Sequence, residues 1–267
     1  MEKNAQKFHF KKILLTSGWA ENATLEVGGD GLISALETDQ KPSGETVSGI
    51  AIPAICNAHS HAFQRAFVGL TEERGDEGDD FWAWRKVMYG ALTKIGPEEL
   101  EAIAAWLYVE MLKSGYAGVA EFHYLHHQAS GAAYENPAEM SEALIRAATA
   151  SGIDFTLLPV LYQRADFGTA DINEGQRPFY FELEDYAALL GHLKKKCRTG
   201  VALHSLRAVP EGIISDAAAL TGGPVHIHIA EQIAEVERCL EVHGRRPVEW
   251  LLENVEVGEN WNLIHAT

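Results

Sequence analysis

Apolar and polar positions follow two different patterns along this chain, and the change comes near residue 50. Before it, short alternating runs cover residues 8–15, 23–27 and 32–36, with a glycine-rich turn at 28–31. Runs of period two that are broken by glycine predict β-strands joined by turns. We therefore expect residues 1–49 to form a small antiparallel β unit, part of a β-sandwich.

From residue 50 onward, short apolar runs alternate with longer stretches of helical pattern, which favours βαβ units around a parallel sheet. The candidate strands are 50–58, 117–123, 153–161, 200–206, 224–230 and 261–266. The helical stretches between and around them are 97–114, 137–151, 182–196, 211–220, 231–242 and 247–254. Polar residues recur at the strand ends, and no Gly-x-Gly-x-x-Gly follows the first strand. This combination predicts a (β/α)8 barrel rather than an open doubly wound sheet.

The barrel pattern can be followed through six strands in residues 50–267, whereas a closed barrel of this class has eight. We therefore expect an α/β fold with about six of the eight units present, in a chain that is part of a longer protein. The two expected domains are 1–49 and 50–267.

Composition narrows the functional classes. A formal net charge of −16 over 267 residues argues against a protein that binds a nucleic-acid backbone. Three scattered cysteines form neither a disulfide framework nor a Cys-x-x-Cys pair, which favours a reducing compartment. No apolar stretch approaches the length of a membrane span. These observations predict a cytoplasmic protein without a membrane or nucleic-acid partner.

Two histidines, His59 and His61, stand at the end of the first candidate strand of the barrel. A strand of period two directs both imidazoles to the same side, which is a good start for a zinc site with an open position for water. His228, at the end of the fifth strand, offers a third nitrogen ligand. His226 lies on the same face of that strand, but barrel active sites lie at the carboxyl ends of strands, which favours His228.

Glu231 follows the same strand, within reach of a water molecule on the metal. Zinc lowers the pKa of its water to about 7, and a neighbouring carboxylate can carry the proton to a leaving nitrogen. The alternative for Glu231 is a helix N-terminal residue that the helix dipole favours. His265, near the end of the sixth strand, would polarise the attacked group or steady the hydroxide. The fourth strand has no lysine that could bridge two metals, so we expect a single ion.

Four segments are similar to a known family: NAHSHAFQR at 57–65, EFHYLHH at 121–127, LHSLRAV at 203–209 and HIHIAEQ at 226–232. The chain resembles the amidohydrolase superfamily, whose pattern has His-x-His on the first strand, single histidines on the fifth and sixth, and Asp on the eighth. Within it, these segments look like the N-formimino-L-glutamate deiminases of histidine degradation. The sequence has no counterpart of the eighth-strand Asp.

The resemblance implies one zinc ion on His59, His61 and His228, with Glu231 and His265 in proton transfer and hydroxide activation. It also implies hydrolysis of the formimidoyl C–N bond of a small dicarboxylate, formiminoglutamate, to formylglutamate and ammonia. The substrate-binding residues that it implies are Gln64, Tyr124, His204 and Arg207. A homodimer is compatible with this reading.

Several alternatives remain open at this stage. Arg207 fits a carboxylate as a bidentate fork, but it could instead pair with an acidic helix at the surface. Tyr124 could serve in packing alone. Arg85 is the candidate for the second carboxylate, with cation–π packing in its aromatic-rich loop as the alternative. The histidines at 123, 126 and 127 are expected in surface or supporting roles. For the whole chain, the alternatives are a deaminase or chlorohydrolase acting on a heterocycle, and an inactive or binding-only fragment.

Overall fold

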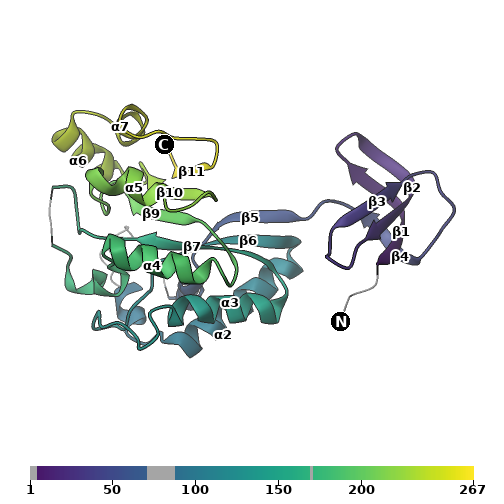
Figure 1. Cartoon of the computed structure of the whole chain (residues 1–267), viewed down its shortest axis with the longest axis horizontal. Helices are drawn as coiled ribbons and strands as arrows, with labels where there is room; N and C mark the ends of the chain where they lie inside the picture. Colours follow the sequence, from purple (N-terminus) through teal and green to yellow (C-terminus); the bar gives the residue numbers. More distant parts are fainter. Residues whose placement is uncertain (1–4, 71–87, 169–170) are drawn as a thin grey trace. The chain divides into compact units, whose positions relative to one another are not determined.

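The computed structural model describes residues 5–70, 88–168 and 171–267, and these fall into two compact units, Met1–Ile55 and Cys56–Thr267. The first unit holds one mixed sheet of four strands: β1 (Gln6–Leu15), β2 (Gly18–Val27), β3 (Ile33–Glu37) and β4 (Glu45–Ala51). Its strand order is β3-β2-β1-β4 (Figure 1). The sandwich stays a prediction, because one sheet of this unit is described.

The prediction of a wholly antiparallel first unit is wrong at its last strand. β1 pairs antiparallel with β2, and β2 with β3, but β4 joins β1 in parallel. A long connection from Thr38 to Gly44 carries the chain back to the start of β1, which allows this direction. Gly44 has a φ of 82°, and a Cβ there would lie 2.4 Å from the Lys7 carbonyl oxygen, so only glycine fits this close approach.

The second unit is built on the parallel sheet that the sequence predicts. Its strands lie in the order β11-β10-β9-β7-β6-β5, and the pairs from β6 to β11 along this path are parallel. The strands are β5 (Ile55–Ser60), β6 (Tyr116–His123), β7 (Asp154–Leu161), β9 (Val201–Ser205), β10 (Val225–Ile229) and β11 (Trp261–His265), and the short β8 (Arg198–Thr199) pairs with β7. The curled sheet and its helices confirm the α/β barrel architecture (Figure 1).

One strand boundary differs from the prediction. The apolar run 50–58 was expected to form one strand, but it is divided between β4, which ends at Ala51, and β5, which begins at Ile55. Pro53 lies in the gap, where its missing N–H cannot contribute to a ladder. The same run therefore supplies the last two residues of β4 and most of β5, the first strand of the barrel.

The helices follow the predicted alternation with strands. They are α2 (Pro97–Lys113), α3 (Glu139–Ser151), α4 (Leu183–Leu193), α5 (Ile214–Ala218), α6 (Ile233–His243) and α7 (Pro247–Asn254), with 3-10 turns η1 (Ala62–Phe67), η2 (Glu174–Phe179) and η3 (Glu211–Ile213). Pro97 begins α2, and Gly152 ends α3 with a φ of 78°, as helix-start and helix-stop signals predict. None of the helices in the described ranges is long and apolar enough to cross a membrane.

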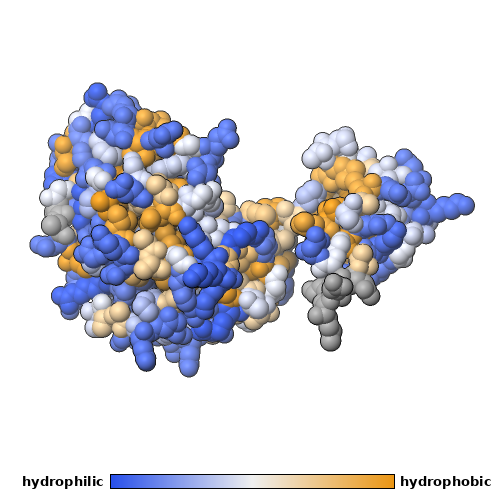
Figure 2. Space-filling view, in the orientation of Figure 1, coloured by the Kyte–Doolittle hydropathy of each residue, from blue (hydrophilic) through white to orange (hydrophobic). Residues whose placement is uncertain are grey.

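The core of the second unit lies between the sheet and its helices. β10 is buried along its whole length, and β7 is buried over its last five residues, as expected for central strands covered on both faces. Hydrophilic residues dominate the helical surface on the face that Figure 2 shows, while hydrophobic residues gather toward the middle of the unit. The carboxyl ends of the strands therefore project from a rigid, packed support.

Candidate metal centre and substrate pocket

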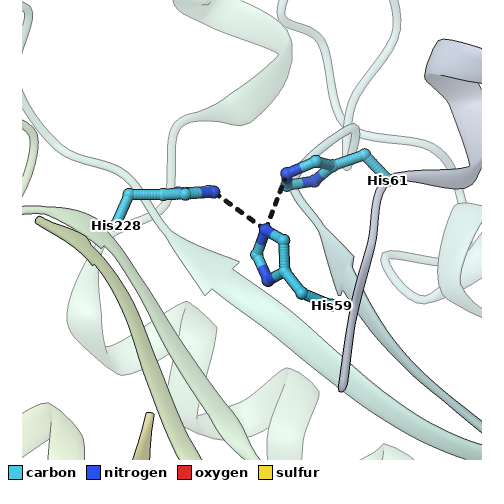
Figure 3. Close-up of side chains that lie close together, drawn as sticks. All are labelled: His59, His61 and His228. Atoms are coloured by element: carbon cyan, nitrogen blue, oxygen red, sulfur yellow. Dashed lines mark hydrogen bonds between the residues drawn. The ribbon is translucent and has the colours of Figure 1, made fainter. Parts of the chain in front are cut away.

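His59, His61 and His228 lie together at the carboxyl ends of β5 and β10, although 167 or more residues separate His228 from the first two in sequence. The Nε2 atom of His59 is 3.0 Å from Nε2 of His61 and 3.0 Å from Nε2 of His228 (Figure 3). One ligand atom from each ring lies within 4.8 Å of the others. In a tetrahedral zinc site, with Zn–N near 2.1 Å, ligand atoms lie roughly 3.4 Å apart. The three rings thus have the spacing of a metal centre.

Backbone carbonyls fix the orientation of two of these rings. Nδ1 of His61 donates to the carbonyl oxygen of Phe122 at 3.0 Å, and Nδ1 of His228 donates to that of His204 at the same distance. A ring that carries its proton on Nδ1 presents a lone pair at Nε2, which is the form that binds a metal. The strands next to β5 and β10 therefore supply the carbonyls that prepare the ligand atoms.

Burial keeps these histidines neutral. It lowers the pKa of His59 to about 3 and of His61 to about 4, with the neighbouring imidazoles adding to the effect on His59. The pKa of His228 is also lowered, again mainly by burial. Three neutral nitrogen donors that face one another without a shared proton fit a divalent cation. Among the residues that the structure describes, this is the single group of three or more potential ligands.

Glu121 on β6 is a buried carboxyl group that contacts the chain next to His61. Its Oε1 accepts a hydrogen bond from the backbone N–H of Ala62 at 2.5 Å, and its Oε2 accepts one from the Tyr108 hydroxyl at 3.4 Å. Ser60 adds a further side-chain hydrogen bond. The Glu121 carboxyl group thus contacts Ser60 and Ala62, the two residues next to His61 in the chain. These contacts fix the backbone that carries His59 and His61.

Glu121 should make the stability of the metal-free protein depend on pH. Burial raises its pKa to about 7 from 4.5, so the folded state stabilises the protonated form, and this contribution is lost as the pH rises from 4.5 to 7. A shift of this size corresponds to about 3 kcal/mol. The free energy of unfolding of the Glu121→Gln variant should therefore rise by this amount between pH 4.5 and 7, relative to that of the unmodified protein. Urea unfolding of both proteins in the presence of a chelator measures this difference. A difference that is constant with pH would contradict the shifted pKa.

Glu231 and His265 face each other beside the histidine group, with Glu231 Oε1 3.8 Å from His265 Nε2. The His265 ring stacks on His228 at a centroid distance of 5.6 Å. Ala230 and His265 have φ values of 54° and 73°, a region that non-glycine residues rarely adopt and that concentrates at functional sites. The Glu231 N–H donates to Glu235 at the start of α6. This backbone directs the Glu231 carboxylate into the pocket, outside the group of potential metal ligands.

The pocket next to the metal centre contains most of the substrate-binding residues that the sequence suggests. Its lining residues are His61, Gln64, Met88, Tyr89, Tyr124, Tyr162, Phe179, His204, Arg207, His228 and Glu231. Gln64 donates to the Tyr124 hydroxyl at 3.0 Å, so this side chain has a polar contact inside the pocket. Arg85 lies outside the described residues, as does the aromatic-rich loop around it, so its role stays a prediction.

Arg207 is held from several sides, and the carboxylates of Glu235 on α6 and of Asp166 act on its charge. Its Nη1 donates to the Ala165 carbonyl oxygen at 2.6 Å and to the Tyr162 hydroxyl at 3.3 Å. The buried guanidinium of Arg164 donates to the backbone carbonyls of Leu206 and Arg207, at 2.7 and 2.9 Å, and pairs with Glu211. A second arginine thus fixes the loop that presents Arg207.

The other histidines have supporting contacts. His226 is buried and stacks on His59 at a centroid distance of 6.3 Å. His126 and His127 contact the carbonyl oxygens of Val160 and Tyr180 through Nε2. None of them belongs to the group of potential metal ligands, as far as the described residues extend. Their imidazoles therefore act in packing and loop anchoring.

Sequence reasoning did not assign Tyr162, Arg164 or Glu121 to the site. Tyr162 and Glu121 did stand among the polar residues at strand ends, so their position was a usable signal. Arg164 had none, because its contacts are two backbone carbonyls and the Glu211 carboxylate, all 42 or more residues away.

Comparison with known proteins agrees with this geometry. The sequence is 47% identical to a formimidoylglutamate deiminase of Pseudomonas aeruginosa, over 96% of this chain and 58% of that protein. It is 27% identical to a 5-methylthioadenosine/S-adenosylhomocysteine deaminase of Natronomonas pharaonis, over 75% of this chain and 42% of the relative. The chain thus spans about three-fifths or less of the length of these relatives.

Solved structures show the same fold. An amidohydrolase from Brucella melitensis matches with a TM-score of 0.92 and 44% identity, over 98% of this chain and 60% of that one. An atrazine chlorohydrolase from Arthrobacter aurescens, solved with zinc, matches with a TM-score of 0.77 over 98% of this chain and 60% of that one. At 18% identity, the second match shows the fold alone. The sequence pattern of the amidohydrolase family matches residues 50–261, so this chain belongs to the amidohydrolase family.

Proposed function

We propose that the protein to which this chain belongs hydrolyses the formimidoyl C–N bond of N-formimino-L-glutamate. Water adds its oxygen to the formimidoyl carbon, the bond to the terminal nitrogen breaks, and the products are N-formyl-L-glutamate and ammonia. The observation that carries the proposal is the presence of Arg207 in the same pocket as His61 and His228, two of the three clustered histidines. The 47% identity to a formimidoylglutamate deiminase supports the choice of substrate.

We assign one zinc ion to His59, His61 and His228, whose neutral Nε2 atoms suit it. A zinc ion in this position supplies a nucleophile at neutral pH by lowering the pKa of water. Glu231 accepts the proton that the attacking water loses and delivers it to the leaving nitrogen. His265, 3.8 Å from this carboxylate, donates to the attacked group or orients the water.

The substrate carries two carboxylates, and the pocket offers cationic and polar donors for them. Arg207 can bind one carboxylate through Nε or Nη2, which donate no hydrogen bond to the described residues, while Glu235 and Asp166 act on its charge. His204, Gln64 and Tyr124 line the same pocket and complete the predicted set. Arg85 stays the candidate for the second carboxylate.

Replacing Arg207 by methionine should separate recognition from chemistry. Hydrogen bonds to charged groups contribute about 1.5–3 kcal/mol, so we expect kcat/KM for formiminoglutamate to fall roughly 10- to 100-fold. For the mono-amide in which an amide replaces the carboxylate bound by Arg207, the same substitution should lower kcat/KM far less. Steady-state kinetics with both mono-amides identify which carboxylate Arg207 holds.

The control is Arg146→Met, which removes an exposed arginine that pairs with Glu101. It should leave kcat/KM unchanged for formiminoglutamate and for both of its mono-amides. Equal losses with formiminoglutamate and both mono-amides would mean that Arg207 supports the fold and does not read the substrate.

A second candidate function is deamination or dechlorination of a heterocycle by the same metal site. Tyr124, Tyr162 and Phe179 line the pocket and could stack on a ring, and the more distant relatives include nucleoside-type deaminases. Ammonia release from formiminoglutamate, measured beside guanine and cytosine, distinguishes the two. Turnover of a heterocycle with none of formiminoglutamate would refute our proposal, and no turnover with bound ligand would favour a binding-only role.

Other expectations stay predictions. They are the domain boundary at residues 49 and 50, a homodimer, the absence of a nucleic-acid partner and a cytoplasmic location. None of them alters the chemistry proposed for the pocket.

A further inference from the structure

Tyr162 follows β7 directly and lines the pocket that also contains Arg207, His61 and His228. Its side chain is 2% exposed, and its ring packs edge-on against His204 at a centroid distance of 4.6 Å. The phenol oxygen lies 3.3 Å from Nη1 of Arg207 and 2.7 Å from Nε2 of Gln176. The direction of these two hydrogen bonds decides what the phenol proton can do.

Both neighbours of the phenol oxygen are donors. An arginine guanidinium has no acceptor, so Arg207 donates. The Gln176 amide is oriented by its other end, because its Oε1 accepts the backbone N–H of Asn173 at 2.9 Å. Its Nε2 therefore faces Tyr162 and donates as well.

These two bonds occupy the lone pairs of the phenol oxygen and leave its proton unused. A tyrosine hydroxyl has one proton to donate and two lone pairs that accept. No described residue accepts a hydrogen bond from the Tyr162 hydroxyl. Burying a donor without an acceptor costs free energy, unless a ligand accepts the hydrogen bond. The hydroxyl lines the substrate pocket, so a ligand can supply the acceptor.

We propose that Tyr162 is a further substrate-binding residue, which donates its phenol proton to the carboxylate that Arg207 grips. The inference rests on the proposed function, since it takes a carboxylate as the ligand of Arg207. Because Nη1 of Arg207 is already used by Ala165 and Tyr162, a carboxylate oxygen that meets the neighbouring Nη2 of Arg207 can also accept the proton of the Tyr162 hydroxyl. Donation from Arg207 to the phenol oxygen also polarises the hydroxyl and makes it a better donor.

The Tyr162→Phe variant removes only the hydroxyl and should weaken carboxylate binding. We expect the Kd for N-formyl-L-glutamate, measured by calorimetry on the zinc-loaded protein, to rise roughly 10-fold or more. KM for formiminoglutamate should rise in parallel, with a smaller change in kcat. An unchanged Kd, with the protein folded, would overturn the inference.

Tyr186→Phe is the matched control. Tyr186 is equally buried, but its hydroxyl donates to the Pro159 carbonyl oxygen and lies outside the pocket. Its loss should lower the thermal unfolding temperature and leave Kd unchanged. Should Tyr162→Phe fail to fold because the Gln176 amide loses its acceptor, Tyr162→Phe with Gln176→Leu removes that amide and permits the same measurement.

A double-mutant cycle with Arg207→Met separates direct contact from support of Arg207. If Tyr162 touches the carboxylate, its removal still weakens binding in the Arg207→Met background. If the effect disappears there, Tyr162 acts only by positioning Arg207, and the inference is wrong. Failure of the unmodified protein to bind the dicarboxylate would refute the proposed function itself, whereas normal binding by both it and Tyr162→Phe would refute the Tyr162 inference alone.

Discussion

Glu231→Gln is expected to lower turnover of formiminoglutamate about 10²- to 10⁴-fold, the range typical of losing a positioned general base. Glutamine keeps the shape of the side chain and one acceptor oxygen but cannot take a proton from water. Glu231 lines the pocket and lies outside the group of three potential metal ligands, so zinc content should stay unchanged. Steady-state kinetics and metal analysis on the same preparation measure both quantities.

Glu237→Gln is the control for this substitution, because Glu237 is an exposed residue of α6 with the same change in charge. It should leave both turnover and zinc content unaltered. A loss of zinc in parallel with activity in Glu231→Gln would mean that the carboxylate belongs to the metal site and does not act as a proton carrier.

His228→Ala should release the metal, with a loss of zinc affinity larger than the roughly 10- to 100-fold that follows removal of an outer hydrogen-bond partner. The reason is that His228 contributes one of three clustered nitrogens, and a zinc centre left with two protein ligands here is incomplete. Competition with a chromophoric chelator measures the affinity without any need for activity. The same loss should remove turnover.

His226→Ala is a stringent control, since His226 lies on the same strand two residues earlier and its ring stacks on His59. It should retain zinc with at most a modest loss of affinity. If His226→Ala released zinc and His228→Ala did not, the choice between the two histidines of β10 would be reversed.

Local pattern was sufficient for much of the barrel. The alternation of apolar runs and helical stretches specified the elements because burial on a sheet or a helix face imposes its own period on the sequence. The pair His59 and His61 was readable for the same reason, since residues two apart share a strand face. Pro97 and Gly152 marked a helix start and a helix end through constraints on their own backbones.

Local pattern was insufficient to predict the direction in which a strand pairs with a strand that is distant in the sequence. Nothing in residues 45–51 distinguishes a parallel from an antiparallel neighbour, so the pairing of β4 with β1 was missed. The division of the run 50–58 at Pro53 was readable in principle, because proline withholds a ladder donor. We predicted one continuous strand because the run 50–58 is almost entirely apolar.

By itself, the sequence determined which residue types stand at the strand ends, because strand periodicity and turn positions are local properties of the chain. Only the tertiary structure decided how they work together. It brought His228 to the first-strand pair, used the carbonyls of Phe122 and His204 to leave Nε2 of His61 and His228 open, and placed Tyr162 in the pocket beside Arg207. These outcomes depend on where backbone carbonyls and amides of other strands and loops lie, and such positions are fixed by packing across the whole barrel rather than by side-chain pattern.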